Sequence, residues 1–147
     1  MTPSRSKLGR WLVVAVRLVL GGVFIYAAWT KLREPWLLFA MAIDAYGVLP
    51  EWAVLAVARA LPWAELALGI VLIAGVGLRI SATAASLLML VFFSLMVRSY
   101  AQGLAISCGC FGADEAISPR TLARDGLLLV ASIFLAAISF RNPRAAA

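Results

Sequence analysis

Residues 11–29 read WLVVAVRLVLGGVFIYAAW, an almost unbroken apolar stretch whose single charged residue is Arg17. A helix needs about 20 apolar residues to cross the hydrocarbon core of a bilayer, and this stretch has that length. A short basic lead, residues 1–10, comes before it. We therefore predict a first membrane-spanning helix at residues 11–29, and the fold depends on how many similar stretches follow.

A basic lead followed by an apolar core is also the pattern of a secretory signal peptide. Two features favour a retained helix. Arg17 interrupts the apolar core, and bulky Trp29 stands where a cleavage site requires small residues. The long side chain of Arg17 can carry its guanidinium back to the membrane surface, and the alternative is a buried functional charge.

Three further apolar stretches predict a bundle of four membrane-spanning helices, and they lie at residues 52–74, 80–97 and 119–140. Residues 37–46 are apolar but form a shorter stretch that contains Asp44, which predicts a helix lying at the membrane interface after the first span. Ser118 and Pro119 are typical of the N-cap and the first position of a helix, so they mark where the last span begins. The predicted fold class is an all-α membrane protein.

The composition agrees with this fold class, because 64% of the 147 residues are hydrophobic and only 14% are charged. In a soluble protein the net charge of +6 would suggest an anionic partner. Here the basic residues flank the apolar stretches, where they orient the chain and contact lipid headgroups. We expect the lipid bilayer as a partner and no nucleic acid.

The basic residues also predict the orientation of the chain. Lys and Arg are equally frequent on the two sides, so the prediction depends on the basic lead, which usually stays in the cytoplasm. Residues 1–10 and the tail, residues 141–147, are then cytoplasmic. The loop between the third and fourth spans lies outside, on the oxidising side of a bacterial inner membrane.

Two ionisable residues, Arg59 and Glu65, lie within the second span together with Pro62. They are six residues apart, on nearly opposite faces of a helix, so we do not expect them to pair. Lys31, at the end of the first span on the same side, is the expected partner of Glu65. The pair either fixes helix packing or gives Glu65 a role in proton handling or substrate binding. Pro62 is expected to kink the helix, since it removes a backbone hydrogen bond.

Both cysteines stand in the loop after the third span, as Cys108-Gly109-Cys110, and the chain has no histidine. Two ligands are too few for a structural zinc site or an iron–sulfur cluster within one chain, and the usual haem histidine is missing, so we expect no metal. A disulfide across one glycine would close a small, strained and easily reduced ring. This favours redox exchange over a static bridge, and unpaired or lipid-modified cysteines are a third alternative.

Five motifs follow one another between about residues 17 and 140: Lys31-Leu32, Tyr46 with Leu49-Pro50, Leu61-Pro62-Trp63-x-Glu65-Leu66, Cys108-Gly109-Cys110-Phe111-Gly112 and Arg124-Asp125. In this order they resemble the MauE family of methylamine-utilisation proteins, within the wider DoxX-like group. The resemblance implies a four-helix membrane protein linked to thiol and disulfide chemistry, in some members to maturation of a disulfide-rich periplasmic dehydrogenase. It adds supporting residues to the cysteine site, namely Lys31, Pro62, Trp63, Glu65, Phe111, Gly112, Arg124 and Asp125. Methylamine metabolism itself is not implied, because many relatives occur outside methylamine users.

The cysteine pair predicts thiol–disulfide exchange at the outer face of the membrane. One cysteine attacks, or is attacked by, a periplasmic thioredoxin-like or other disulfide-containing protein, and the second resolves the mixed disulfide. Gly109 supplies the flexibility that ring closure requires. Arg98, Arg120 or Arg124 is expected to favour the thiolate by its proximity.

The electrons of such an exchange need a further carrier, because the chain has no second cysteine pair. A membrane quinone is the candidate cofactor, in a pocket that includes Trp63 and Glu65. Two other classes of function stay open. The chain is either a non-catalytic assembly factor or small subunit that docks a periplasmic redox enzyme, or a transporter or channel, which only the charges within the spans suggest.

Overall fold

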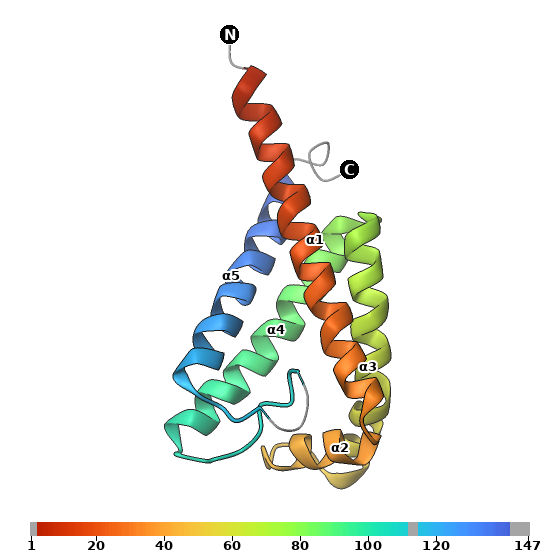
Figure 1. Cartoon of the computed structure of the whole chain (residues 1–147), viewed down its shortest axis with the longest axis vertical. Coiled ribbons are helices and arrows are strands. Elements are labelled where there is room, and N and C mark those ends of the chain that lie inside the picture. The colour runs from red at the N-terminus through yellow and green to blue at the C-terminus, as the bar shows by residue number, and fades with distance from the viewer. Residues whose placement is uncertain (1–2, 112–114, 142–147) are drawn as a thin grey trace.

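The computed structural model describes residues 3–111 and 115–141 (Figure 1). Its five helices are α1 (Pro3–Arg33), α2 (Trp36–Asp44), α3 (Glu51–Ala74), α4 (Leu78–Ala101) and α5 (Pro119–Arg141). Within the described residues there is no strand, and one antiparallel bridge joins Ser107 to Ala116. Four helices are long and apolar enough to cross a membrane, which confirms the predicted fold class.

The outer surface of the bundle is apolar. Trp11, Ile80 and Leu127 are each more than 70% exposed, and many other large apolar side chains also face outward. In water such a surface would promote aggregation, whereas lipid chains are as apolar as leucine and solvate it. The natural environment of this surface is therefore the lipid bilayer.

The bundle is built from two closely packed helix pairs, α1 with α3 and α4 with α5. Gly21 of α1 and Gly69 of α3 face one another at the first contact. A Cβ built on Gly21 would lie 2.9 Å from the carbonyl oxygen of Gly69, and one built on Gly69 would lie 2.8 Å from that of Gly21. These two glycines let the helix backbones touch, as small residues do in membrane helices.

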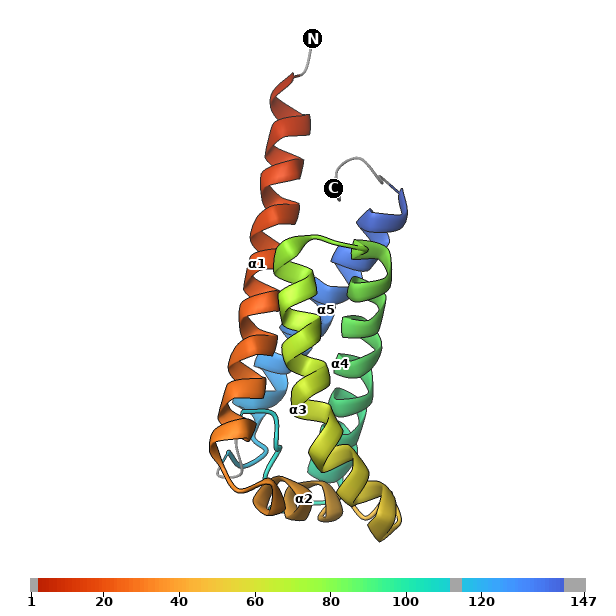
Figure 2. The ribbon, with the colours of Figure 1, turned by 90° about the vertical axis from the view of Figure 1, so that its right-hand side faces the viewer.

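Helix α2 lies across one end of the bundle, beside the loop that joins α4 to α5 (Figures 1 and 2). It begins at residue 36, one residue before the predicted start, and ends at residue 44, two residues before the predicted end. The earlier end arises because Tyr46 and Gly47 already form the turn toward α3. The buried side chains Phe39, Ala40 and Ala42 pack toward the bundle. This position brings α2 against the cysteine loop.

Two arginines within the spans lie against other segments of the chain. The guanidinium of Arg17 lies against Gly75, in the turn between α3 and α4. The guanidinium of Arg59 stacks over the ring of Trp36 at 4.4 Å, so Arg59 does not pair with Glu65. Helix α3 continues through Pro62, which is buried.

The start of α5 follows the predicted capping pattern. The Ser118 side-chain oxygen accepts a hydrogen bond from the backbone N–H of Thr121 at 3.3 Å, and Pro119 occupies the first helical position. The cap ends the cysteine loop at a defined point and turns the chain back into the bundle.

Candidate functional site

The cysteine loop folds back on itself between α4 and α5. The backbone N–H of Cys108 donates to the Glu115 carbonyl at 2.8 Å, and that of Ile117 donates to the Ile106 carbonyl at 3.1 Å. Gly109 has a φ of +67°, which side chains other than glycine rarely adopt. The role of Gly109 is therefore to hold a sharp turn between the two cysteines. This role is more specific than the flexibility that the sequence suggests.

Both cysteines are free thiols and both are buried. Cys108 has no exposed surface, and Cys110 is 8% exposed. The backbone N–H of Cys110 points at the sulfur of Cys108 at 3.5 Å. The hydroxyl of Tyr46 donates to the Cys108 carbonyl at 2.9 Å, and the Cys110 sulfur lies 3.8 Å from the sulfur of Met96 in α4. The turn after α2 and the last turns of α4 thus hold the pair in place.

The two thiols differ in their affinity for a proton. A hydrogen bond from the Cys110 side chain lowers the pKa of Cys108, although burial and the Glu115 carboxylate act in the opposite direction. The same hydrogen bond, together with burial, raises the pKa of Cys110. Cys108 is therefore the thiol that ionises first, and the thiolate is the form that attacks a disulfide.

Charged side chains hold the base of the loop on α5. Arg124 binds Glu115 at 2.5 Å and Asp125 at 2.9 Å, and its guanidinium lies 4.4 Å from the centre of the Phe111 ring. The Cys108 thiol donates to the Glu115 carboxylate at 3.5 Å. Arg124 is therefore linked to Cys108 through Glu115.

The other two arginines that the sequence offers to the thiolate, Arg98 and Arg120, are exposed. Asp125 is buried beside Arg124 and has a side chain only 5% exposed. The Arg124 guanidinium, which is the positive charge of α5 beside the cysteine loop, is therefore already paired with the carboxylates of Glu115 and Asp125.

A buried ion pair joins α1 to α3 near the cysteines. The ammonium of Lys31 donates to both carboxylate oxygens of Glu65, at 2.6 and 2.7 Å, and both side chains are at most 5% exposed. The ammonium also faces the rings of Phe39 and Phe92, at 5.1 and 5.9 Å from their centres. The predicted pairing of Lys31 with Glu65 is confirmed.

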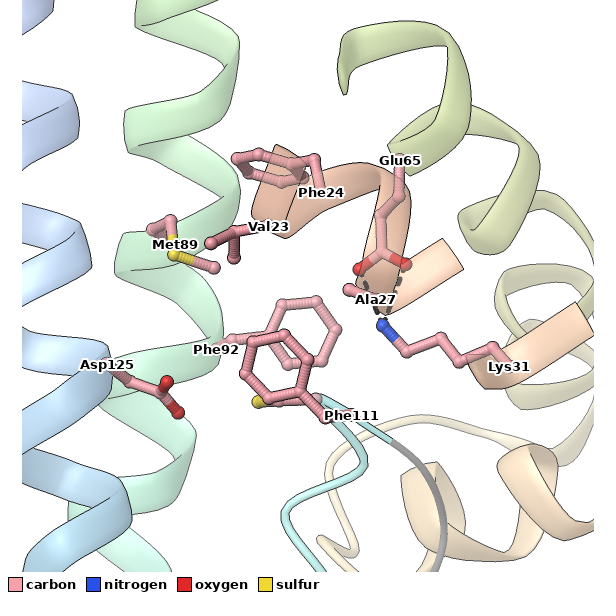
Figure 3. A pocket seen from close by; sticks show the side chains of 10 residues that line it. Val23, Phe24, Ala27, Lys31, Glu65, Met89, Phe92, Phe111 and Asp125 are labelled. Atoms are coloured by element: carbon pink, nitrogen blue, oxygen red, sulfur yellow. Dashed lines mark hydrogen bonds and ion pairs between the residues drawn. The ribbon is translucent and has the colours of Figure 1, made fainter. Parts of the chain in front are cut away.

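A small cavity of about 20 Å³ lies between this ion pair and the cysteine loop. Figure 3 shows Lys31 and Glu65 on one side of it, Asp125 on the other, and the rings of Phe92 and Phe111 between them. Cys110 also contributes to the lining. The volume suits a single water molecule rather than a substrate.

A second, much larger cavity of about 400 Å³ lies on the other side of the cysteine loop, among α2, α3 and α4. Cys108 and Gly109 form part of its wall. The remaining lining residues are Phe39, Ala42, Ile43, Tyr46, Val48, Leu49, Val57, Leu61, Leu88, Val91, Phe92 and Leu95, none of them charged. The two cysteines thus line different cavities, Cys108 the large apolar one and Cys110 the small one.

The structure brings together most of the residues that the sequence analysis selects, with two exceptions. Trp63 is 62% exposed on the outer face of α3 and lines neither cavity. Gly112 lies outside the described residues. Pro62 is buried one turn from Glu65 and lines neither cavity.

The residues that contact the cysteines through a hydroxyl, carboxylate or sulfur and were not selected as site residues from the sequence are Tyr46, Glu115 and Met96. Tyr46 belongs to one of the motifs that carry the family resemblance, and this was the one available signal. Among the described residues no group of three or more His, Cys, Asp or Glu side chains gathers as a metal site would require.

Comparison with known families gives one match of nearly full length. A family model described as methylamine utilisation protein MauE matches residues 9–138. No curated protein and no solved structure matches the chain. The matched segment includes all four candidate membrane spans almost entirely, both cysteines and the Lys31–Glu65 pair. The chain is a membrane protein with four apolar helices and two neighbouring cysteines, and it belongs to the MauE family.

Proposed function

We propose that this protein exchanges disulfides through Cys108 and Cys110 with a thioredoxin-like protein outside the cytoplasm. The observation that carries the proposal is the pair of adjacent free thiols with opposite proton affinities, one with a lowered pKa and one with a raised pKa. An exchange reaction needs this division, because one sulfur attacks as a thiolate while the other keeps its proton until the second step.

The exchange proceeds in two displacement steps. The Cys108 thiolate attacks one sulfur of the partner's disulfide, a Cys108–partner bond forms, and the partner's other sulfur leaves as a thiolate. Cys110 then loses its proton and attacks the Cys108 sulfur. This step forms the Cys108–Cys110 disulfide and releases the partner as a dithiol. The same steps in reverse transfer the disulfide to the partner.

A protein partner needs access that the closed loop does not give, because Cys108 is completely buried. The loop is held by the backbone bonds of Cys108 and Ile117 and by the Glu115–Arg124 ion pair. The ion pair is about one third exposed at both ends, so water and ions screen it. The exchange therefore includes an opening step in which this hairpin separates from α5.

The cysteine loop faces the periplasm of a bacterium in this proposal, and both termini face the cytoplasm. The described beginning of α1 and end of α5 lie at one end of the molecule and the cysteine loop at the other, which supports a separation of the two across the membrane (Figure 1). The basic residues Lys7 and Arg10 beside the start of the first span support the direction. We also propose a membrane quinone as the carrier that exchanges electrons with the cysteine pair. We further propose that the family belongs to the wider DoxX-like group.

A non-catalytic docking or maturation role for a periplasmic redox enzyme is the second candidate. The burial of both thiols favours it, since buried cysteines are often inert. In this role the cysteine loop is a shaped contact surface and its thiols take no part in chemistry.

Trapping the mixed disulfide tests the proposal. The Cys110→Ser variant, which keeps Cys108 and lacks the resolving thiol, is incubated with an oxidised periplasmic thioredoxin-like protein. We expect a disulfide-linked heterodimer on a non-reducing gel, with the linkage at Cys108 by mass spectrometry. The parent chain should release the partner instead and accumulate little heterodimer.

The Cys108→Ser and Cys110→Ser double variant is the control and should give no heterodimer. If neither single variant forms the mixed disulfide, and both support maturation of the periplasmic enzyme as well as the parent does, the exchange mechanism is wrong and the docking role stands.

A further inference from the structure

The large cavity beside Cys108 is too big to be a packing defect. Protein interiors are packed at the density of organic crystals and rarely leave voids larger than a water molecule. A volume of about 400 Å³ lies within the range of small-molecule sites, about 300–1,000 Å³. Its walls are apolar side chains, with Cys108 and Gly109 of the cysteine turn also among the lining residues.

The cavity exists because α3 and α4 separate. They are joined by the short turn after Ala74 and then diverge toward the cysteine end, where α2 crosses (Figure 1). Each of them packs more closely against another helix, α3 against α1 and α4 against α5. Three residues that line the cavity are strongly exposed, Val91 to 57%, Val48 to 47% and Leu49 to 43%, so the cavity is not sealed inside the bundle. A ligand can therefore enter from the lipid phase.

We propose that this cavity binds the head ring of a membrane quinone beside Cys108. The inference rests on the proposed exchange function, because a dithiol formed by exchange needs a carrier that removes two electrons. A phospholipid chain would fit the apolar walls but has no chemistry with a thiol. A quinone combines apolar substituents with a ring that accepts two electrons and two protons.

The step balances with these reactants alone. Cys108 and Cys110 together lose two protons and two electrons and form their disulfide. The quinone takes up the two protons and the two electrons and becomes a quinol. Cys108 is the cysteine nearer to the ring, since this residue lines the apolar cavity, and Cys110 lines the small cavity that Glu65 and Asp125 also line. This site lies away from Trp63, which faces outward, and so replaces the pocket of Trp63 and Glu65 that the sequence suggests.

Filling the cavity tests the site. Leu95 of α4 lines it, whereas Leu90 of the same helix is 47% exposed and does not. The purified, reduced full-length protein in lipid nanodiscs is mixed with decylubiquinone, and disulfide formation is followed by thiol alkylation and mass spectrometry. We expect Leu95→Trp to slow the oxidation at least tenfold and the matched control Leu90→Trp to leave it within twofold of the parent.

Each outcome separates the two proposals. If Leu95→Trp is oxidised as fast as the parent, or the parent is not oxidised by decylubiquinone while Cys110→Ser still traps the thioredoxin-like partner, the quinone site is wrong and the exchange function stands. If no variant traps the partner, the exchange function itself fails.

A second measurement on the unaltered protein does not depend on the folding of a variant. An azido-substituted quinone is activated by light, and the labelled peptides are mapped. We expect the label on residues of α2 and α4 that line the cavity, such as Ile43 and Leu95. Tightly bound phospholipid that excess quinone does not displace, with no label on these peptides, would make the cavity a lipid site and overturn the inference.

Discussion

At the scale of single residues, the site gives two identical side chains different chemistry. Cys108 and Cys110 are both buried, yet one hydrogen bond between them lowers the pKa of the first and raises that of the second. Gly109 makes this possible, because its positive φ lets the chain turn back within one residue. The difference between the thiols is a property of the turn.

The Cys110→Ala variant tests this difference. We expect it to raise the pKa of Cys108, because the thiolate loses its hydrogen-bond donor while burial and the Glu115 charge still act on it. The rate of Cys108 alkylation by iodoacetamide, measured against pH, should therefore rise at a higher pH than in the parent. Met96→Leu is the control, since it changes the other neighbour of Cys110 and keeps the hydrogen bond between the thiols. A midpoint unchanged by Cys110→Ala would contradict the assignment.

The sequence identifies only part of this site, for physical reasons. The pairing of Lys31 with Glu65 was predictable, because a lone carboxylate within a span needs a countercharge on the same side of the membrane. The contact between Glu115 and Cys108 was not predictable, because it depends on the hairpin of the cysteine loop, and a hairpin leaves no hydropathy pattern in the sequence. Tyr46 and Met96 approach the thiols from separate segments of the chain, and only the tertiary structure brings them there.

At the scale of elements, the Lys31–Glu65 pair links α1 to α3 close to the site. Removing one partner leaves the other charge buried, so we expect Lys31→Met to lower the free energy of unfolding by about 3–5 kcal/mol. Replacing both residues, with Lys31→Met and Glu65→Leu together, should restore most of that loss. Unfolding by SDS titration in bicelles measures both effects.

The double variant also separates the two roles that the sequence leaves open for this pair. No hydrogen bond in the described structure joins Lys31 or Glu65 to a cysteine sulfur. We therefore expect the stable double variant to exchange disulfides at a rate within a few-fold of the parent. A stable double variant that no longer exchanges would indicate a proton-handling role instead.

The helices themselves were largely predictable and their contacts were not. Apolar stretches of about 20 residues identify spans, but a helix continues into polar residues where its backbone bonds stay satisfied, as α4 does to Ala101. The separation of α3 from α4, and with it the apolar cavity, follows from which helices pair. Pairing depends on small contacts such as Gly21 with Gly69, which hydropathy does not rank.

At the scale of the whole molecule, the proposed orientation can be tested away from the buried thiols. In a chain that carries Cys108→Ser and Cys110→Ser, one new cysteine is introduced at exposed Ala116 of the cysteine loop or at Val76, which is 66% exposed in the turn between α3 and α4. An impermeant maleimide should label Ala116→Cys in intact cells and Val76→Cys only after the membrane is opened. The reverse pattern would invert the topology and contradict a periplasmic partner.

The complete burial of Cys108 has a kinetic consequence. If a partner reacts only with the open loop, the observed rate is the rate of the open form multiplied by the fraction of molecules that are open. An open state about 2.7 kcal/mol above the closed one is populated in roughly one molecule in a hundred, and it slows every protein reagent in solution a hundredfold. A partner that binds the open loop more tightly than the closed loop raises the open fraction, so the hundredfold slowing does not apply to its own reaction. The closed loop thus makes the reactivity of the Cys108 thiol depend on how well an oxidant binds the open loop.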